Sequence, residues 1–186
     1  MDYNNWFVLQ VLTNREHFVK NFITNNINIK TNLLLFSNEL IFKRKGRFIK
    51  VNRSLFPGYL FINQNIQDIV NNIKDRLQNE YIRPVCFKRD KCSYCFSERS
   101  PCMVKPEEMR LLLENSDKSG LFKLSYGYKK NDNIIITRGP LMNLKGNIIA
   151  INERKKVAQV ELFLFKRKMK TTLGIDLIKK AEKTLV

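Results

Sequence analysis

The four cysteines of the chain gather in one short stretch, where they could bind a metal ion. Cys86, Cys92, Cys95 and Cys102 follow the spacing C-x5-C-x2-C-x6-C. Four thiolates can hold Zn²⁺ in a tetrahedral structural site, and a C-x2-C pair is a common part of such sites. Because the outer spacings are irregular for a zinc motif, we predict no metal site and no other cofactor, and structural zinc stays open as an alternative.

The same cysteines and the single histidine offer little basis for catalysis. Cys92-Ser93-Tyr94-Cys95 does not follow a strand–helix–strand pattern of the kind that carries thiol redox motifs. His17 has no nucleophile close to it in sequence, which a catalytic base usually needs. The chain contains neither a phosphate-binding lysine loop nor G-x-G-x-x-G. We therefore expect a protein that is not an enzyme, and a zinc or thiol protein is the weaker alternative.

The net charge of the chain is strongly positive. Lys and Arg number 34 against 17 Asp and Glu, a net charge of +17, and residues 117–186 alone hold 16 basic and 6 acidic residues. Such a charge attracts polyanions, above all nucleic acid. The sequence shows no clear basic amphipathic helix and no lipidation motif, so a membrane surface is a less favoured partner than nucleic acid. No apolar run approaches the ~20 residues of a bilayer span, and the first residues do not resemble a signal peptide, so we expect a cytoplasmic protein.

Basic residues gather at the expected turns of the second part of the chain. The candidate nucleic-acid-binding residues there are Lys129, Lys130, Arg154, Lys155, Lys156, Lys166, Arg167, Lys168 and Lys170. Adjacent turns of a small barrel can meet in space and form one patch, and phosphates bind such a patch with release of counterions. Tyr128, Phe163 and Phe165 would stack on unpaired bases if they are exposed, and otherwise belong to the core.

A second basic cluster lies in the first half of the chain, at the tip of an expected hairpin. It consists of Lys43, Arg44, Lys45 and Arg47. A charged exposed turn explains the cluster without any partner. The functional alternative is contact with the phosphates of DNA.

The stretch SLFPGYLFI, residues 54–62, is apolar on both faces. Pro57-Gly58 marks a turn, and in the strand that follows Tyr59 and Phe61 point to one face while Leu60 and Ile62 point to the other. One face must pack on the core of the domain. The other is either covered as well, as in a central strand, or forms an apolar patch that binds a partner. Periodicity alone does not decide between these two interpretations.

Turn signals and hydrophobic spacing predict the elements that position these residues. Thr13 and Glu16 fit a capping box, with a hydroxyl at the N-cap and a carboxylate three residues later. The expected elements are, in order, a strand at 6–12, a helix carrying Phe18 to Ile23, a strand at 31–36, a hairpin at 39–53 that turns at Lys45-Gly46, the strand of the FPGY stretch, a helix at 65–77 and a helix from Pro106. Strands that cluster between helices favour an α+β fold with an antiparallel sheet flanked by helices.

Beyond residue 116 the pattern changes to short strands. The polar stretch 115–120 has the composition of a linker, and strands are expected at 133–137, 146–151, 156–165 and 171–178. Short strands separated by Gly, Asn, Pro and charges predict a small all-β barrel. The predicted organisation is a first domain at 1–116, a linker at 117–128 and a second domain at 129–186.

Two of these motifs together resemble the NusG family of transcription elongation and antitermination factors. The first is Trp6-Phe7-Val8 with Phe56-Pro57-Gly58-Tyr59, and the second is the KOW-like stretch IIITRGPLMNLKGNIIAINERKKVAQVELFLFKR. The resemblance implies an α+β NGN domain followed by an SH3-like KOW barrel. It further implies that the NGN domain binds the clamp helices of bacterial RNA polymerase. The implied polymerase-binding residues are Phe7, Phe56, Pro57, Tyr59 and Phe61.

Within the family, the sequence is most similar to the LoaP group of processive antiterminators. The general NusG factor commonly has Phe-Gly-Arg where this chain has Phe165-Lys166-Arg167, and the lysine adds charge at a strand end that contacts Rho or a ribosomal protein in the general factor. The LoaP resemblance implies that the KOW domain binds a leader RNA hairpin. The DNA contact considered for Lys43, Arg44, Lys45 and Arg47 would then be with upstream DNA beside the polymerase, and we expect the protein to be a monomer. A general elongation factor coupling polymerase to Rho or the ribosome is the alternative. Resemblance to the RfaH branch raises a further state, in which the second domain covers the aromatic face.

Overall fold

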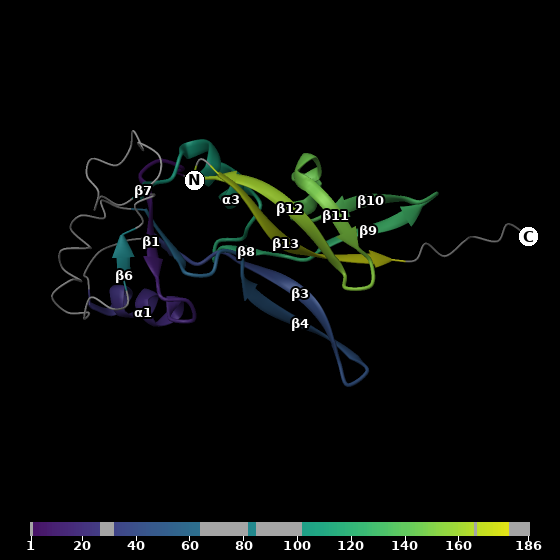
Figure 1. The fold of residues 1–186 in the computed structure, drawn as a ribbon, viewed down its shortest axis with the longest axis horizontal. Coiled ribbons are helices and arrows are strands. Elements are labelled where there is room, and N and C mark those ends of the chain that lie inside the picture. The colour runs from purple at the N-terminus through teal and green to yellow at the C-terminus, as the bar shows by residue number, and fades with distance from the viewer. Residues whose placement is uncertain (1, 27–31, 64–81, 85–101, 166, 179–186) are drawn as a thin grey trace, which may run out of the picture. The chain divides into compact units, whose positions relative to one another are not determined.

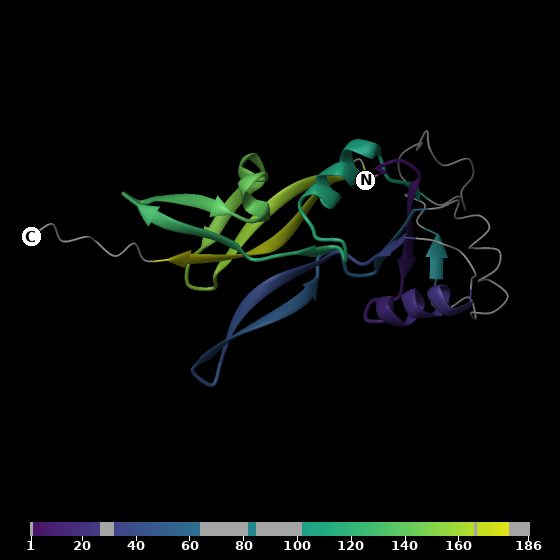
Figure 2. The same cartoon turned by 180° about the vertical axis from the view of Figure 1, so that it is seen from behind.

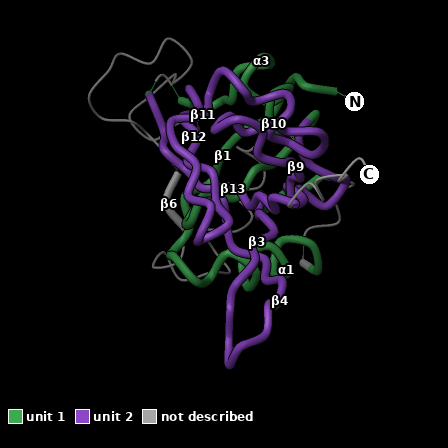
Figure 3. Tube along the Cα trace, turned by 90° about the vertical axis from the view of Figure 1, so that its right-hand side faces the viewer, with its two compact units in different colours: residues 1–36, 56–114, 164–167 green, residues 37–55, 115–163, 168–186 purple. Residues whose placement is uncertain are grey.

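The computed structural model of the 186-residue chain describes residues 2–26, 32–63, 82–84, 102–165 and 167–178. The chain forms two compact units that interleave along the sequence (Figure 3). Unit 1 contains residues 1–36, 56–114 and 164–167, and unit 2 contains residues 37–55, 115–163 and 168–186.

Unit 1 is built on an antiparallel sheet with β1 (Trp6–Val11) at its centre. Its neighbours are β5 (Tyr59–Asn63), β6 (Ile82–Pro84) and β7 (Cys102–Met103), and β2 (Asn32–Leu34) pairs with the far side of β5. Two helices of unit 1 are described, α1 (Glu16–Asn26) and α3 (Pro106–Glu114) (Figure 1). Helix α3 begins at the predicted Pro106, with Glu107 and Glu108 in its first turn, where the helix dipole favours carboxylates.

The core of unit 1 lies between α1 and the sheet. Its buried members are Leu9 and Val11 of β1, Val19 and Ile23 of α1, Leu33 of β2, and Leu60 and Ile62 of β5. The helix residues fall four apart and therefore lie on one stripe, whereas the strand residues alternate along their strands. The predicted core face of the FPGY strand, Leu60 and Ile62, is confirmed as buried.

Unit 2 contains a five-stranded sheet in the order β10-β9-β13-β12-β11. Its strands are β9 (Ser125–Lys130), β10 (Asn133–Arg138), β11 (Ile148–Asn152), β12 (Val157–Leu164) and β13 (Arg167–Ile178), of which the last residue of β12 and the first of β13 belong to unit 1. Two short 3-10 turns, Pro140–Met142 and Lys145–Asn147, connect β10 to β11. β13 runs parallel to β9. Closure of this sheet into an SH3-like barrel stays a prediction.

The second sheet of unit 2 is an arm formed by β3 (Ser37–Arg44) and β4 (Arg47–Ser54). Its turn at Lys45-Gly46, where both residues have positive φ, confirms the predicted hairpin and matches the twist of a two-residue β-turn. A third short strand, β8 (Leu121–Phe122), pairs in parallel with the start of β3. Figures 1 and 2 show the arm extending from β8 to a free tip at the turn.

Three further predictions concern a second helix of the first domain, the linker and a membrane span. The predicted helix at 65–77 lies outside the described residues. Residues 117–128, predicted as a linker, contain β8 and the first part of β9. Across the described ranges, no helix is both long and apolar enough to cross a membrane.

Candidate functional sites

The Phe56-Pro57-Gly58-Tyr59 stretch forms a tight turn that begins β5. The Tyr59 N–H donates to the Phe56 carbonyl oxygen at 3.1 Å, and Gly58 has φ of 81°. Proline at the second position and glycine with positive φ at the third are typical of a type II turn. The turn also packs against β1, because a Cβ built on Gly58 would lie 3.1 Å from the carbonyl oxygen of Val11. Pro57-Gly58 therefore sets where β5 starts and which faces its side chains take.

The buried carboxylate of Glu16 fixes this turn in place. Its Oε1 accepts a hydrogen bond from the Gly58 N–H at 2.8 Å, while the Val11 N–H donates to the Gly58 carbonyl at 2.8 Å. The predicted capping box is therefore wrong, since α1 begins at Glu16 itself and the carboxylate is used on the turn, 42 residues away along the chain. Glu16, which the sequence pattern assigned to a helix cap, therefore holds the turn before β5 through a long-range hydrogen bond.

The second face of β5 is covered by other aromatic rings within unit 1. Phe61 packs edge-on against Phe36, with ring centroids 4.8 Å apart, and lies 5.9 Å from Phe56. Phe36, Phe56 and Phe61 are each at most 2% exposed. Burial of this size and T-shaped ring pairs both stabilise a packed cluster. Of the two interpretations of this face, the structure supports the covered one for Phe61, because Phe61 is fully buried.

The segment Leu164–Arg167, which belongs to unit 1, continues this aromatic cluster. The Phe165 ring stacks on Tyr59 with centroids 5.9 Å apart and an interplanar angle of 10°, and it lies 6.1 Å from Phe61. Arg167 Nη2 donates to the Tyr59 hydroxyl at 2.7 Å. Phe165 is 6% exposed and has φ of 54°. Both ends of the Tyr59 side chain therefore have a partner from one short segment.

The five residues predicted to bind polymerase differ in exposure. Pro57 is exposed, and Phe7 and Tyr59 are half-buried. Phe56 and Phe61 are buried in the aromatic cluster. The structure therefore brings the five residues together around β1 and β5, with Pro57 the most accessible of them.

In unit 2, several of the predicted nucleic-acid-binding lysines are paired with carboxylates. Lys168 Nζ lies 2.8 Å from Glu161 Oε1, and Lys156 Nζ lies 2.6 Å from Asp176 Oδ1. Lys129 contacts both Asp132, at 3.3 Å, and Glu153, at 3.5 Å. A hydrogen bond with Asp132 raises the pKa of Lys129, with a further contribution from Glu153. The hydrogen bond with Glu161 likewise raises the pKa of Lys168.

Other predicted cations have no carboxylate partner in the described part of the chain. They are Lys43, Lys130, Arg154, Lys155 and Lys170, all of them exposed. Arg167 has its hydrogen bond to Tyr59, and Lys166 lies outside the described residues. The hairpin-tip residues Arg44, Lys45 and Arg47 are exposed at the end of the arm.

A groove in unit 2 brings residues of both basic clusters together. Its cavity volume is about 1050 Å³. It is lined by Asn38, Leu40, Ile41, Phe42, Lys43, Phe48, Arg53 and Ser54 of the arm and by Arg154, Lys155, Lys156, Val157, Lys170, Thr171 and Thr172. Sequence reasoning placed the two clusters in separate domains and missed Phe48 and Arg53. The available signal was the mixture of apolar and basic residues in β4, RFIKVNRS.

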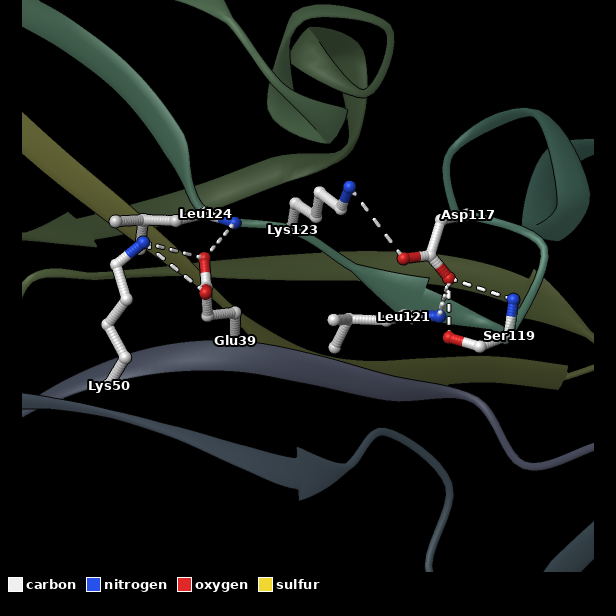
Figure 4. A network of polar contacts seen from close by, with 7 residues as sticks. All are labelled: Glu39, Lys50, Asp117, Ser119, Leu121, Lys123 and Leu124. Carbon is white, nitrogen blue, oxygen red and sulfur yellow. Dashed lines mark hydrogen bonds and ion pairs between the residues drawn. The ribbon is translucent and has the colours of Figure 1, made fainter.

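A network of polar contacts joins the arm to the rest of unit 2 (Figure 4). The Glu39 carboxylate accepts a hydrogen bond from the Leu124 N–H at 3.1 Å and pairs with Lys50 at 3.3 Å, and the hydrogen bond with Glu39 raises the pKa of Lys50. Beside it, Asp117 accepts hydrogen bonds from Ser119 and Leu121. Burial raises the pKa of Asp117, but these hydrogen bonds outweigh it and the net shift is downward.

The remaining predicted residues have different outcomes. Phe163 is 56% exposed on β12, Tyr128 is half-buried, and Phe165 belongs to the buried cluster of unit 1.

Cys86, Cys92 and Cys95 lie outside the described residues, as does the side chain of Cys102. Within the ranges that the structure covers, no group of His, Cys, Asp or Glu could hold a metal ion. Zinc binding by the cysteines stays untested.

Comparisons with known proteins place the chain in a family. Residues 4–113 match the family model described as "Transcription termination factor nusG". The "Transcription termination/antitermination protein NusG" of Thermus thermophilus is 25% identical over 153 residues, which cover 80% of this chain and 80% of the relative. The solved structure described as "Domain interaction in Thermotoga maritima NusG" has a TM-score of 0.46 and 22% identity, covering 92% of this chain and 93% of that chain. Since the matched residues span more than half of its length, the chain belongs to the NusG family, whose members are transcription factors and not enzymes.

Proposed function

We propose that this chain is a processive transcription elongation and antitermination factor of the cytoplasm. It binds RNA polymerase through the residues around β1 and β5, and it binds a leader RNA hairpin through the basic residues of its second region. Membership of the NusG family carries the proposal, since the matched residues 4–113 include β1, the FPGY turn and β5. A NusG-family factor binds RNA polymerase, and the clamp helices are the proposed contact.

The proposed polymerase contact uses Phe7, Phe56, Pro57, Tyr59 and Phe61. Of these, Pro57 is exposed at the turn and Tyr59 is half-buried under Phe165. A partner helix that packs on Tyr59 and Phe61 must take the place of the Phe165 ring. The contact then exchanges one apolar surface for another, so the net gain depends on the additional area that the helix buries.

The proposed RNA contact rests on the distribution of charge. Lys130, Arg154, Lys155 and Lys170 are exposed and have no carboxylate partner in the described part of unit 2. Cations without such partners gain most from phosphates, because no internal ion pair has to be broken. The exposed tip residues Arg44, Lys45 and Arg47 are assigned to upstream DNA beside the polymerase.

A general NusG-type factor is the second candidate, and the name of the Thermus thermophilus relative covers both termination and antitermination. The two candidates differ in what they need. A specialised antiterminator requires its own RNA hairpin, whereas a general factor acts without one. Lys166, in place of the glycine common in the general factor, favours the specialised function.

Transcription in vitro through an intrinsic terminator tests the proposal. We expect readthrough to rise when the chain is added to purified bacterial RNA polymerase, and to rise only on templates that encode the cognate leader hairpin. Increased readthrough on every template would support the general factor instead. No effect on elongation, pausing or termination on any template would contradict both candidates.

A Tyr59→Ala variant separates the two proposed contacts. We expect it to lose readthrough while its affinity for the hairpin RNA stays unchanged, because Tyr59 lies on the polymerase side of the proposal. Phe18→Ala is the matched control, since Phe18 is an aromatic residue of unit 1 that is 50% exposed on α1. Loss of RNA binding by a folded Tyr59→Ala variant would contradict this division.

A further inference from the structure

We infer that the groove of unit 2 is a binding site for single-stranded RNA, shared by the β3–β4 arm and the turn between β11 and β12. This goes beyond a basic patch that holds a paired hairpin. It assigns the arm, which the sequence pattern relates only to DNA, to the recognition of unpaired RNA bases. The inference rests on the proposed RNA-binding function.

The arm and β13 are packed closely at the inner end of the groove. A Cβ on Gly174 would lie 2.2 Å from the Glu39 carbonyl oxygen, so only glycine permits this approach of β13 to β3. The Asn38 side chain donates a hydrogen bond to the Thr172 carbonyl, and the Thr171 hydroxyl donates to the Leu55 carbonyl at 3.4 Å. At the base of the groove, the arm and β13 are therefore held together by this close approach and by two hydrogen bonds from side chains to backbone carbonyls.

The lining is cationic. Lys43, Arg53, Arg154, Lys155, Lys156 and Lys170 contribute six positive side chains, and among the described residues that line the groove none is acidic. Only Lys156 is paired with a carboxylate, that of Asp176. A concave surface with one sign of charge focuses its field and attracts a chain of phosphates. Charge complementarity thus selects a nucleic-acid backbone as the occupant.

An exposed aromatic ring in the same groove selects an unpaired strand over a duplex. Phe48 is 59% exposed, and Lys156 Nζ lies 4.6 Å from its ring centroid. A second ring, that of Phe42, has the Arg53 guanidinium 4.5 Å from its centroid. Aromatic rings beside cations stack on single-stranded bases, whose faces are open, whereas a duplex keeps its bases stacked on one another.

Hydroxyl groups in the lining favour RNA over DNA. Asn38 and Thr171 use their donor groups on backbone carbonyls at the base of the groove, whereas Ser54 and Thr172 bring further hydroxyl groups to the lining. These groups can exchange hydrogen bonds with the ribose 2′-hydroxyl, which is both a donor and an acceptor and is absent from DNA. We therefore assign the groove to RNA.

The test measures the affinity of the full chain for a fluorescent pyrimidine RNA of about ten nucleotides, a length within the range of single-strand sites. We expect Phe48→Ala to bind this strand about tenfold more weakly, since one stacked base is lost. Phe18→Ala is the matched control, because Phe18 of α1 is exposed to a similar extent, 50%, but does not line the groove. Equal losses in both variants, or no loss in Phe48→Ala, would overturn the inference.

A second pair of variants tests the charge. Lys170→Gln is expected to reduce the slope of log affinity against log salt concentration by about 0.7, the value for one phosphate contact on a single strand. Lys118→Gln, an exposed lysine of unit 2 outside the groove, should leave the slope unchanged. An unchanged slope in Lys170→Gln would remove this residue and the cationic wall from the site.

The competitors in the same assay separate failure of the inference from failure of the proposed function. Tighter binding of the fully paired RNA duplex, or of DNA of the same sequence, than of the single strand would overturn the groove assignment while leaving RNA or DNA binding intact. A wild-type chain that binds neither the single strand nor any hairpin RNA would contradict the proposed RNA-binding function itself.

Discussion

The aromatic cluster of unit 1 and the basic groove of unit 2 satisfy their side chains in opposite ways. Phe36, Phe56 and Phe61 are almost completely buried against one another and against Phe165. In the groove, Phe48 is 59% exposed, and five of its six cations have no carboxylate partner in the described part of the chain. The side chains of the aromatic cluster contact one another within unit 1, whereas most cations of the groove are exposed and can bind an external anion.

Burial and exposure therefore have different consequences for the aromatic rings of unit 1 and for the cations of the groove. Burial of an aromatic ring contributes to folding, so a partner that uses the cluster must replace contacts that already exist. An exposed cation contributes little to folding and keeps its full interaction with an external phosphate. Substitutions in the cluster should therefore act on stability first, and substitutions in the groove on binding first.

The largest expected effect is that of Phe61→Ala. Phe61 is fully buried, and its removal should lower the free energy of unfolding by about 3–5 kcal/mol, the range for large-to-small changes in a core. Urea unfolding followed by the fluorescence of Trp6, the single tryptophan and a buried residue of the same unit, measures the change. Phe163→Ala should change it by less than about 0.5 kcal/mol, as is usual for exposed sites. A loss below about 1 kcal/mol in Phe61→Ala would mean that the ring is open to solvent, and the comparison would fail.

A smaller effect is expected where the FPGY turn is anchored. Glu16→Ala leaves the buried Gly58 N–H without its acceptor at 2.8 Å, which should cost about 1–3 kcal/mol of unfolding free energy. Glu16→Gln keeps an acceptor oxygen at the same position and should recover most of this loss. Glu107→Ala removes an exposed carboxylate from the first turn of α3 and is the control, with an expected loss of less than about 1 kcal/mol. Equal stability of the alanine and glutamine variants would show that the Gly58 hydrogen bond contributes nothing.

The elements that depend on local sequence were predictable. The hairpin needed only Lys45-Gly46 between two runs of strand residues, and α3 needed only Pro106 with two glutamates behind it. The motifs that indicated the NusG family were also read from continuous stretches, namely residues 6–8, residues 56–59 and the KOW-like stretch 134–167. Within a short continuous stretch, the spacing of the residues in the sequence determines how they are arranged in the helix, strand or turn.

The features that failed depend on packing between distant residues. The spacing of Thr13 and Glu16 predicts a capping box, yet α1 begins at Glu16, two residues later than the motif indicates, and the Glu16 carboxylate accepts from the Gly58 N–H instead. Phe61 reads as equally suited to a core or a patch, and Phe36 and Phe165 decide between them. The groove could not be predicted because the approach of β3 to β13 depends on Gly174, which has no distinctive local pattern.

The smallest effect concerns Lys168 of β13, a lysine that has a carboxylate partner. The hydrogen bond with Glu161 raises the pKa of Lys168, so Glu161→Gln should return that pKa toward its ordinary value, as measured by NMR titration of the lysine side chain. A raised folded-state pKa adds stability that is fully present below the unfolded pKa of about 10.4 and is lost as pH rises through the folded value. Wild type should therefore lose stability relative to Glu161→Gln only in this alkaline range, and the two should have nearly the same stability dependence on pH between pH 7 and 9. A Lys168 pKa that does not fall in Glu161→Gln would show that this lysine is as free as Lys170, and the distinction between paired and unpaired cations would have to be redrawn.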